Sequence, residues 1–320
     1  MLKIHDCSIN PFAPKHRNES FGPKENDIMS DLKKYSSELG ISFVRDFRDA
    51  DKIITNTTYT TEIVRYAAEE NIPLIKRMDG VFWRSDLVYR NIKLNEAAIQ
   101  SDAVIFISKF SYDSFHSLYE NSTLEKEYLV LNNSDDEFFK PTKRKKKIKI
   151  WGAAASNWNR KEKRPDELIM FADIVAENDE KIILIGHSNI KHPNIISVGY
   201  FSDYKNIAET ISMTDAWVNF SYMDAAPKTV IQAMKCGKPV LFADSGGLSE
   251  LVRNFGVAIK DNKVIKFSDE NFHLNMNEVN KSYNYFKEKY NNNEFFYDNK
   301  KYIDTLMEYA SIIKITECVF

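Results

Sequence analysis

Asp224 and Gln232 lie on either side of a predicted helix start and could hold the two ends of a phosphorylated ligand. The helix is expected to begin at Pro227, because proline suits the first helical position, where its missing N–H would be unpaired anyway. The backbone N–H groups of Lys228 and Thr229 then point out of the helix, and such unpaired donors favour an anion such as phosphate. Gln232 lies deeper, about 7 Å along the axis at about 1.5 Å per residue. Asp224 and Gln232 therefore bracket a space about as long as one nucleotide-sugar fragment.

The elements that must position these residues form one strand, helix, strand unit between Asp215 and Val252. Its helix is expected to end at Gly237, since glycine followed by proline is a typical helix ending. The loop with Asp224 and Ala225 thus follows the carboxyl end of a strand, where ligands bind in open α/β sheets.

The pattern Asp-x-x-Pro-x-x-Val-x-Gln-Ala-Met-x-Cys-Gly-x-Pro-Val at 224–240, followed by Gly-Gly-x-x-Glu at 246–250, resembles the donor-binding segment of retaining glycosyltransferases with the two-domain GT-B fold, of the group 1 or family 4 type. In that family two acidic residues, separated by seven others, contact the sugar hydroxyls and the ribose. The resemblance implies these roles for Asp224 and Gln232. The sequence departs from the family pattern at both positions, with Asp in place of Glu and with an amide that can still hydrogen-bond a ribose but carries no charge.

Basic residues gather in the loop before a helix predicted to start at Pro165. Lys163-Arg164-Pro165-Asp166 resembles the Lys-Gly-x-Asp of the same family, whose lysine pairs with the donor diphosphate, usually with an arginine nearby. The resemblance assigns this role to Lys163 with Arg160 as its partner, and an extra residue around Glu162 leaves Lys161 as an alternative. A doubly charged leaving group needs such neutralisation as its bond to the sugar breaks. A solvated charged loop without a ligand is the competing interpretation.

Asp79 is the candidate catalytic residue of the N-terminal half. It follows a predicted strand, and the family often has His-Gly at the corresponding point, with Asp-Gly in a subset as here. The resemblance implies that Asp79 faces the cleft and orients the donor sugar or the acceptor hydroxyl. Asp-Gly is also favourable turn chemistry, so a plain turn is the alternative.

Glycines after predicted strands let a backbone approach a ligand. Among the ten glycines of the chain, Gly152 and Gly186 follow predicted strands of the second half. Gly22 lies in a long loop at 7–24, after the first predicted strand, where a doubly wound sheet binds ligands. We expect all three to line the nucleotide-sugar site, with a surface excursion as the alternative for the long loop.

Both halves of the chain alternate short apolar runs with helical patterns, which predicts an α/β fold with parallel sheets covered by helices. By resemblance this is the GT-B fold, two Rossmann-like domains facing a central cleft. The polar segment 132–147 predicts an acceptor-side domain at 1–142 and a nucleotide-sugar-binding domain at 143–294, with a last helix at about 295–320 packing back on the first domain. Strands are expected at 2–5, 41–44, 52–55, 73–76, 103–107, 128–131, 148–151, 181–185, 195–198, 216–220 and 239–242, and helices at 26–39, 59–70, 87–100, 109–119, 165–177, 204–213, 227–236, 248–254, 275–290 and 294–313.

Composition argues against several other classes of protein. The formal net charge of the 320 residues is only -2, and the basic run Lys143 to Lys147 is typical of a solvated segment, so no nucleic-acid partner is expected. No apolar run approaches the roughly 20 residues that span a bilayer, and no leader precedes the first strand, so we expect a cytoplasmic protein without a transmembrane segment. The three cysteines lack metal-ligand spacing, which predicts reduced thiols and no metal site.

The resemblance implies transfer of a hexosyl or related sugar from a nucleotide diphosphate sugar to an acceptor hydroxyl, with retention of configuration and without a metal or other cofactor. UDP-sugars are the first expectation for the donor and GDP-sugars the next, and the acceptor is an unidentified glycan, lipid or small molecule. The alternatives are a nucleotide-sugar epimerase or glycan phosphorylase on the same scaffold, and a catalytically silent nucleotide-sugar-binding protein, which Gln232 in place of an acid suggests.

Overall fold

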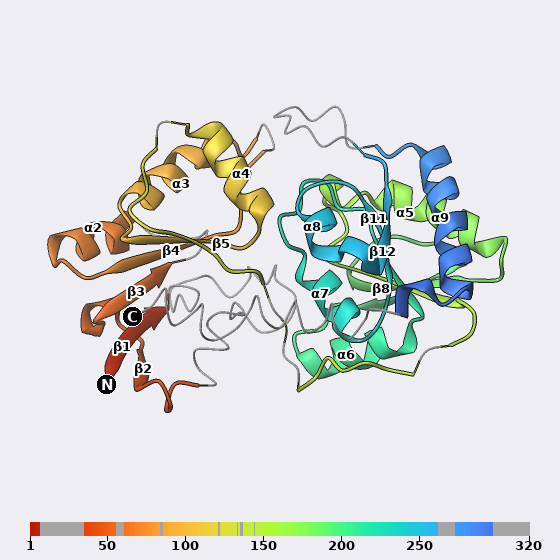
Figure 1. The fold of residues 1–320 in the computed structure, drawn as a ribbon, viewed down its shortest axis with the longest axis horizontal. Helices are drawn as coiled ribbons and strands as arrows, with labels where there is room; N and C mark the ends of the chain where they lie inside the picture. The colour runs from red at the N-terminus through yellow and green to blue at the C-terminus, as the bar shows by residue number, and fades with distance from the viewer. Residues whose placement is uncertain are drawn as a thin grey trace.

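The chain forms two lobes, each built around a six-stranded parallel sheet (Figure 1). The computed structural model describes residues 1–6, 35–55, 61–83, 86–120, 122–132, 134, 137–143, 145–261 and 273–296. Gly22, most of the helix expected at 26–39, and nearly all of the helix expected at 294–313 lie outside these ranges.

The first lobe contains strands β1 to β6 in the order β2-β1-β3-β4-β5-β6. Apolar side chains fill both faces of this sheet, as is usual for parallel sheets covered by helices. Its strands are β1 (Leu2–Asp6), β2 (Ile41–Val44), β3 (Lys52–Thr55), β4 (Leu74–Met78), β5 (Ala103–Phe106) and β6 (Glu127–Leu129), and its described helices are η1 (Phe47–Asp49), α2 (Thr61–Glu69), α3 (Arg90–Ile99) and α4 (Lys109–Leu118).

The second lobe repeats this architecture with the strand order β12-β11-β10-β7-β8-β9. Its strands are β7 (Ile150–Asn157), β8 (Lys181–His187), β9 (Ile195–Gly199), β10 (Ala216–Asn219), β11 (Val240–Ala243) and β12 (Gly256–Ile259). Its helices are η2 (Lys161–Lys163), α5 (Pro165–Ala176), α6 (Tyr204–Met213), α7 (Lys228–Lys235), α8 (Leu248–Val252), η3 (Arg253–Phe255), α9 (Met276–Asn291) and η4 (Glu294–Phe296).

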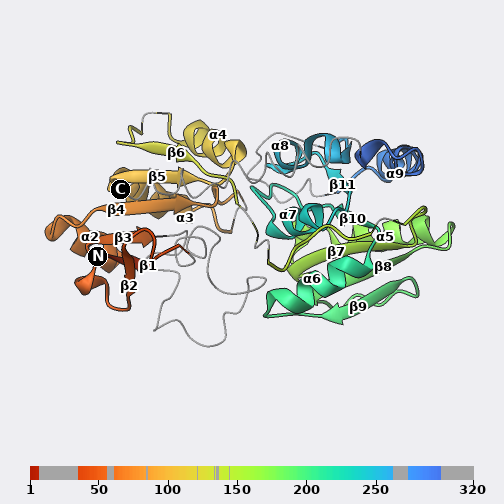
Figure 2. The ribbon, with the colours of Figure 1, turned by 60° about the horizontal axis from the view of Figure 1, so that its bottom comes forward.

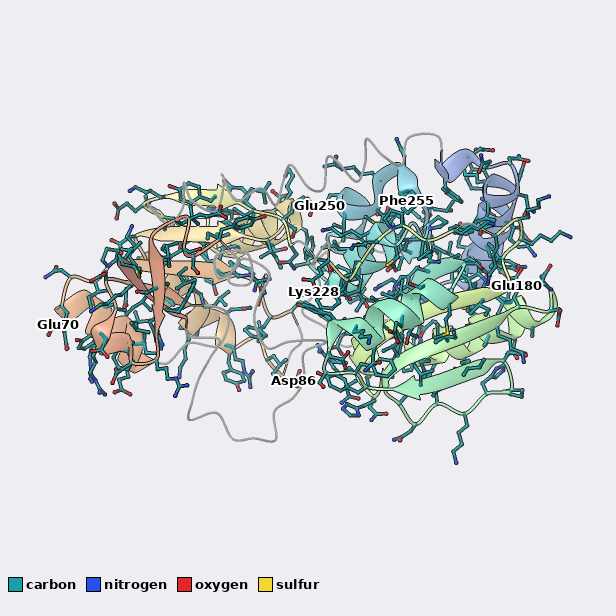
Figure 3. The ribbon with its side chains drawn as sticks, turned by 90° about the horizontal axis from the view of Figure 1, so that it is seen from below. Glu70, Asp86, Glu180, Lys228, Glu250 and Phe255 are labelled. Atoms are coloured by element: carbon teal, nitrogen blue, oxygen red, sulfur yellow. The ribbon has the colours of Figure 1, made fainter. Side chains whose placement is uncertain are left out.

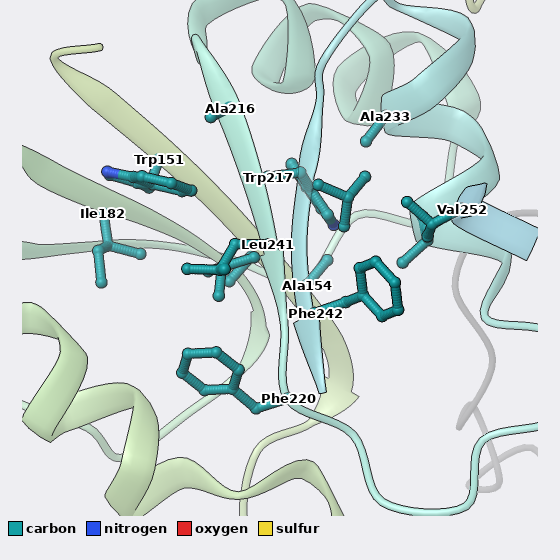
Figure 4. Packing of buried hydrophobic residues seen from close by; sticks show 14 of the residues in the cluster. Trp151, Ala154, Ile182, Ala216, Trp217, Phe220, Ala233, Leu241, Phe242 and Val252 are labelled. Atoms are coloured by element: carbon teal, nitrogen blue, oxygen red, sulfur yellow. The ribbon is translucent and has the colours of Figure 1, made fainter. Parts of the chain in front are cut away.

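The core of the second lobe is a single large cluster that includes Trp151, Trp217 and Leu241 (Figure 4). A buried polar network fixes α9 against it. The Glu180 carboxylate accepts hydrogen bonds from Trp151 Nε1 at 2.8 Å and from the Tyr283 hydroxyl at 3.0 Å, and Lys287 Nζ lies 3.0 Å from its other oxygen. The lobe that carries most of the candidate site is therefore a packed unit.

The two lobes meet where α4 lies beside α8, as Figures 1 and 2 both show. Glu250 of α8 lies at this junction (Figure 3). Its carboxylate accepts hydrogen bonds from the first two backbone N–H groups of α4, those of Lys109, at 2.9 Å, and Phe110, at 2.8 Å. The Ser108 hydroxyl caps the next N–H, that of Ser111. The first N–H groups of a helix have no partner within it. The Glu250 carboxylate of the second lobe therefore supplies the acceptors for the start of α4.

Most predicted strands and helices are confirmed to within a few residues. In the second lobe, one strand was predicted too short and another was not predicted. The strand expected to end at Trp151 continues to Asn157, through the buried residues Ala153, Ala154 and Ala155. The short strand β12 was not predicted. A run of alanines does not stand out as a strand in the sequence. Here these small residues lie in a sheet whose two faces are both covered.

Gly152 consequently lies inside β7, not after a strand as expected. A Cβ at this position would lie 2.2 and 2.3 Å from ring atoms of Trp217 and 2.9 Å from the Thr214 methyl group. The glycine is needed for close packing of the sheet, which explains it without a ligand.

We therefore expect Gly152→Ala to lower the free energy of unfolding by about 1–3 kcal/mol, the usual cost of overpacking, without changing nucleotide affinity. Urea denaturation and nucleotide titration of the same preparation check both values. In a Trp217→Leu background the penalty should shrink, because the clashing ring is gone. Normal stability with weakened nucleotide binding would favour the ligand role instead.

Candidate functional site

A pocket of about 300 Å³ lies between the two lobes and is lined from both sides. It brings together five of the residues singled out from the sequence: Asp79, Arg160, Lys163, Asp224 and Ala225. The other lining residues are Val81, Phe82, Trp83 and Leu87 of the first lobe and Glu162, Tyr222 and Met223 of the second.

The loop between β10 and α7 places Asp224 in the pocket, and hydrogen bonds fix this loop at several points. Met223 has a left-handed backbone conformation (φ 55°), and its N–H donates to the Ser245 hydroxyl at 3.0 Å. The Asp224 carbonyl accepts from Gly247 N–H at 2.9 Å, and Tyr222 N–H donates to the Glu162 carbonyl at 2.8 Å. The Asp224 side chain thus projects from a well-supported backbone.

The two glycines of the Gly-Gly-x-x-Glu motif pack directly on this loop. A Cβ at Gly246 would lie 2.3 Å from the Asp224 carbonyl oxygen, and a Cβ at Gly247 would lie 1.9 Å from that of Ala225. Gly246 also has a φ of 65°, which side chains rarely adopt. The two glycines are therefore needed for the Asp224 loop to pack closely against this turn.

Lys163 and Asp224, the two central residues predicted from the sequence, form an ion pair in the pocket. Lys163 Nζ donates to Asp224 Oδ2 at 2.6 Å and lies 3.3 Å from the Ser221 hydroxyl. The two side chains are only 16% and 21% exposed. Lys161 is exposed and is not among the lining residues, so the structure favours Lys163 over this alternative.

The neighbouring arginines have different surroundings. Arg160 lines the pocket and donates from Nε to the buried Glu162 carboxylate at 2.6 Å. Arg164 is fully buried, has a left-handed backbone (φ 54°) and pairs with Asp261 through two hydrogen bonds of 2.7 and 3.1 Å. Its guanidinium also lies 5.1 Å from the Tyr222 ring centre. Arg164 therefore supports the pocket wall from behind.

Aromatic side chains form a part of the pocket that the sequence did not reveal. Trp83 of the first lobe and Tyr222 of the second meet edge to face, with ring centres 5.0 Å apart. Burial raises the pKa of the Tyr222 hydroxyl, so this group stays protonated near neutral pH and can donate a hydrogen bond. The apolar run Val81 to Trp83, directly after Asp79-Gly80, is the sequence feature from which this wall could have been predicted.

The other predicted site residues are not among those that line this pocket. Pro227 is the N-cap of α7, so the helix begins one residue later than expected. The Lys228 side chain is directed at Tyr204 of α6, whose hydroxyl accepts from Nζ at 2.5 Å. Thr229 and Gln232 are buried, Gln232 completely, and its amide atoms have no hydrogen-bond partner within the described part of the chain. Their contacts with a nucleotide stay a prediction, as does that of Gly186, which lies within β8.

Within the described ranges no helix is long and apolar enough to cross a membrane. Of the three cysteines, Cys236 lies in the described part and is a buried free thiol, whose pKa burial raises to about 11. This thiol is therefore protonated and unreactive at neutral pH.

Comparisons with known proteins identify a family and several solved structures that this chain resembles. Residues 134–292 match the family described as Glycosyl transferases group 1. The N-acetyl-alpha-D-glucosaminyl L-malate synthase of Bacillus anthracis is 26% identical in an alignment of 207 residues that covers 56% of this chain and 54% of that protein. The chain thus spans about half the length of the curated relative that it matches.

Solved structures also resemble nearly the whole chain. Sucrose-phosphate synthase from Thermosynechococcus elongatus matches with a TM-score of 0.67 and 11% identity, over 99% of this chain and 97% of its own. The Anabaena protein HepE in complex with UDP matches with a TM-score of 0.66 and 13% identity, over 100% and 98% of the two chains. The predicted α/β fold of the GT-B type is confirmed.

Proposed function

We propose that this chain, whose residues 134–292 match the glycosyl transferases group 1 family, transfers a sugar from a nucleotide diphosphate sugar to an acceptor hydroxyl. The observation that carries the proposal is the pocket in which Lys163 and Asp224 of that domain meet Asp79 of the first lobe. UDP is the first choice of nucleotide, supported by the UDP-bound structure of HepE among the structural relatives.

Donor binding would exchange one partner of Lys163 for another. In the pocket Lys163 Nζ is bonded to Asp224, and an incoming diphosphate carries more negative charge than a single carboxylate. When Lys163 turns to the diphosphate, the Asp224 carboxylate becomes available to accept hydrogen bonds from the sugar hydroxyls. One ion pair thus couples recognition of the phosphates to recognition of the sugar.

Basic groups of the second lobe would stabilise the leaving group. Lys163 and Arg160 lie in the pocket. The N–H groups at the start of α7 would add a further anion site by the helix dipole. Charge that develops on the diphosphate as the sugar departs is stabilised by such fixed cations and dipoles. We propose that these groups neutralise the leaving group without a metal ion, and that Gln232 holds the ribose.

The acceptor would approach from the first lobe. Asp79 lines the pocket across from Asp224 and has a side chain 40% exposed, so it can orient the acceptor hydroxyl or the donor sugar. The leaving phosphate oxygen itself would take the acceptor proton, on the same face of the sugar, which gives retention of configuration. A hexosyl donor follows from the family resemblance.

Thermal-shift screening against UDP, GDP, ADP and CMP, and then against their sugars, tests the proposal. A ligand present at 100 times its Kd should stabilise the protein by about 2.7 kcal/mol, and we expect UDP to give the largest shift. Slow hydrolysis of the UDP-sugar without acceptor would follow. A protein that binds none of these nucleotides would contradict the proposal.

A catalytically silent binding protein is the second candidate, and Gln232 in place of the family's acid is the observation that favours it. Such a protein would show the thermal shift but would release neither sugar nor nucleotide diphosphate on long incubation. An epimerase on the same scaffold would instead release an isomerised sugar without any acceptor. Product analysis by chromatography therefore separates the three.

A further inference from the structure

Arg77 places a charged guanidinium in the interior of the first lobe, next to the pocket. It lies on β4, whose five residues are all buried, and its side chain is 9% exposed. A buried charge is costly unless it is paired and hydrogen-bonded. Arg77 Nη1 donates to the Asp79 carboxylate, and Nη2 donates to Asn132 Oδ1 at 2.8 Å.

Asn132 carries this connection to the other lobe. It is buried in the segment after β6, and its Nδ2 donates to the Ala226 carbonyl at 3.1 Å. Ala226 lies in the loop between β10 and α7, two residues after Asp224. A continuous chain of hydrogen bonds therefore runs from Asp79 through Arg77 and Asn132 to the loop that presents Asp224.

We infer that Arg77 and Asn132 act as positioning residues, which hold the Asp79 carboxylate of one lobe in register with the Asp224 loop of the other. This inference rests on the proposed function and deepens it. The guanidinium is a rigid planar fork, so two acceptors bound to it keep a fixed mutual orientation. Because reacting groups must be aligned closely, a shift of about 1 Å can cost about 100-fold in rate.

Arg77→Lys tests the inference, because lysine keeps the positive charge but lacks the planar fork. We expect kcat for sugar transfer, or for donor hydrolysis, to fall about 10- to 100-fold. The Kd for the nucleotide should change less than about 3-fold, because Lys163 and Arg160, which are expected to hold the diphosphate, belong to the second lobe. A purely structural role would lower stability and the amount of active protein, and would leave kcat per active site unchanged.

Arg48→Lys is the matched control. Arg48 is an arginine of the same lobe that also pairs with an aspartate, Asp46, but its side chain is 59% exposed. This substitution should leave kcat, KM and nucleotide affinity unchanged.

A double-mutant cycle with Asp79→Asn tests whether Arg77 acts through Asp79. If Arg77 acts through Asp79, Arg77→Lys should add little to the loss that Asp79→Asn already causes, whereas independent effects would multiply. Multiplying effects, or an unchanged kcat in Arg77→Lys, would overturn the inference. If Arg77→Lys fails to fold, the same cycle with Asn132→Ser decides the question by the same criterion.

The wild-type enzyme distinguishes failure of this inference from failure of the proposed function. Turnover by the wild type together with an unaffected Arg77→Lys variant would remove the positioning role and leave the function intact. A wild type that neither transfers nor hydrolyses any nucleotide sugar would overturn both.

Discussion

Lys163→Ala should abolish detectable binding of the nucleotide diphosphate and lower kcat/KM by about 100- to 1000-fold, the usual cost of losing one group that stabilises a transition-state anion. Two effects act in the same direction. The substitution removes the Lys163 ammonium from the pocket, and it leaves the partly buried Asp224 carboxylate without this cation, facing an incoming anion.

Isothermal titration with UDP measures the first part of this prediction and steady-state kinetics the second. Lys161→Ala is the matched control, since Lys161 belongs to the same short helix η2 but is exposed and does not line the pocket. The double variant Lys163→Ala/Asp224→Asn should bind UDP more tightly than Lys163→Ala, because the repulsion is relieved. Unchanged UDP affinity in Lys163→Ala would reject the assignment of Lys163 to the diphosphate.

Arg164→Leu should destabilise the second lobe by about 3–5 kcal/mol, the cost of breaking a buried ion pair from one side. Arg164 is fully buried, and its partner Asp261 has a side chain that is 4% exposed. The substitution removes the two hydrogen bonds to Asp261 and a third, of 3.1 Å, to the Phe220 carbonyl. Asp261 would be left as a buried carboxylate without its guanidinium.

Urea unfolding followed by tryptophan fluorescence measures this loss mainly in the second lobe. Three of the four tryptophans lie in that lobe, namely Trp151, Trp158 and Trp217, and Trp83 lies in the first lobe. In the double variant Arg164→Leu/Asp261→Leu much of the stability should return, since apolar residues often replace a buried ion pair without loss. A loss below about 1 kcal/mol in Arg164→Leu would show that Asp261 finds another partner.

The sequence predicted the Asp224 loop well because local chemistry determines its boundaries. Pro227 and Gly237 delimit α7, and the glycine pair marks the turn that packs on the loop. The parallel sheets could be predicted for a related reason, since their buried strands are short apolar runs between helical patterns. The strand predicted for β7 was too short because alanines are not distinctive of a strand.

Side-chain direction and burial could not be predicted in the same way. Lys163 and Arg164 are adjacent in sequence, yet the left-handed backbone at Arg164 separates their surroundings. One side chain enters the pocket and the other the interior. Arg77 sits in a strand as a charged residue, and its partner Asn132 lies 55 residues away. Only the packed structure shows that such distant groups meet.

The contact between Glu250 and α4 has a consequence for the movement of the lobes. Separation of the lobes at this contact would remove the acceptors of the Lys109 and Phe110 amides, and the first turn of α4 would then exchange its hydrogens with solvent. These two amides are thus an intrinsic reporter of lobe opening. Their exchange rates, measured with and without nucleotide, would follow the opening without any attached label.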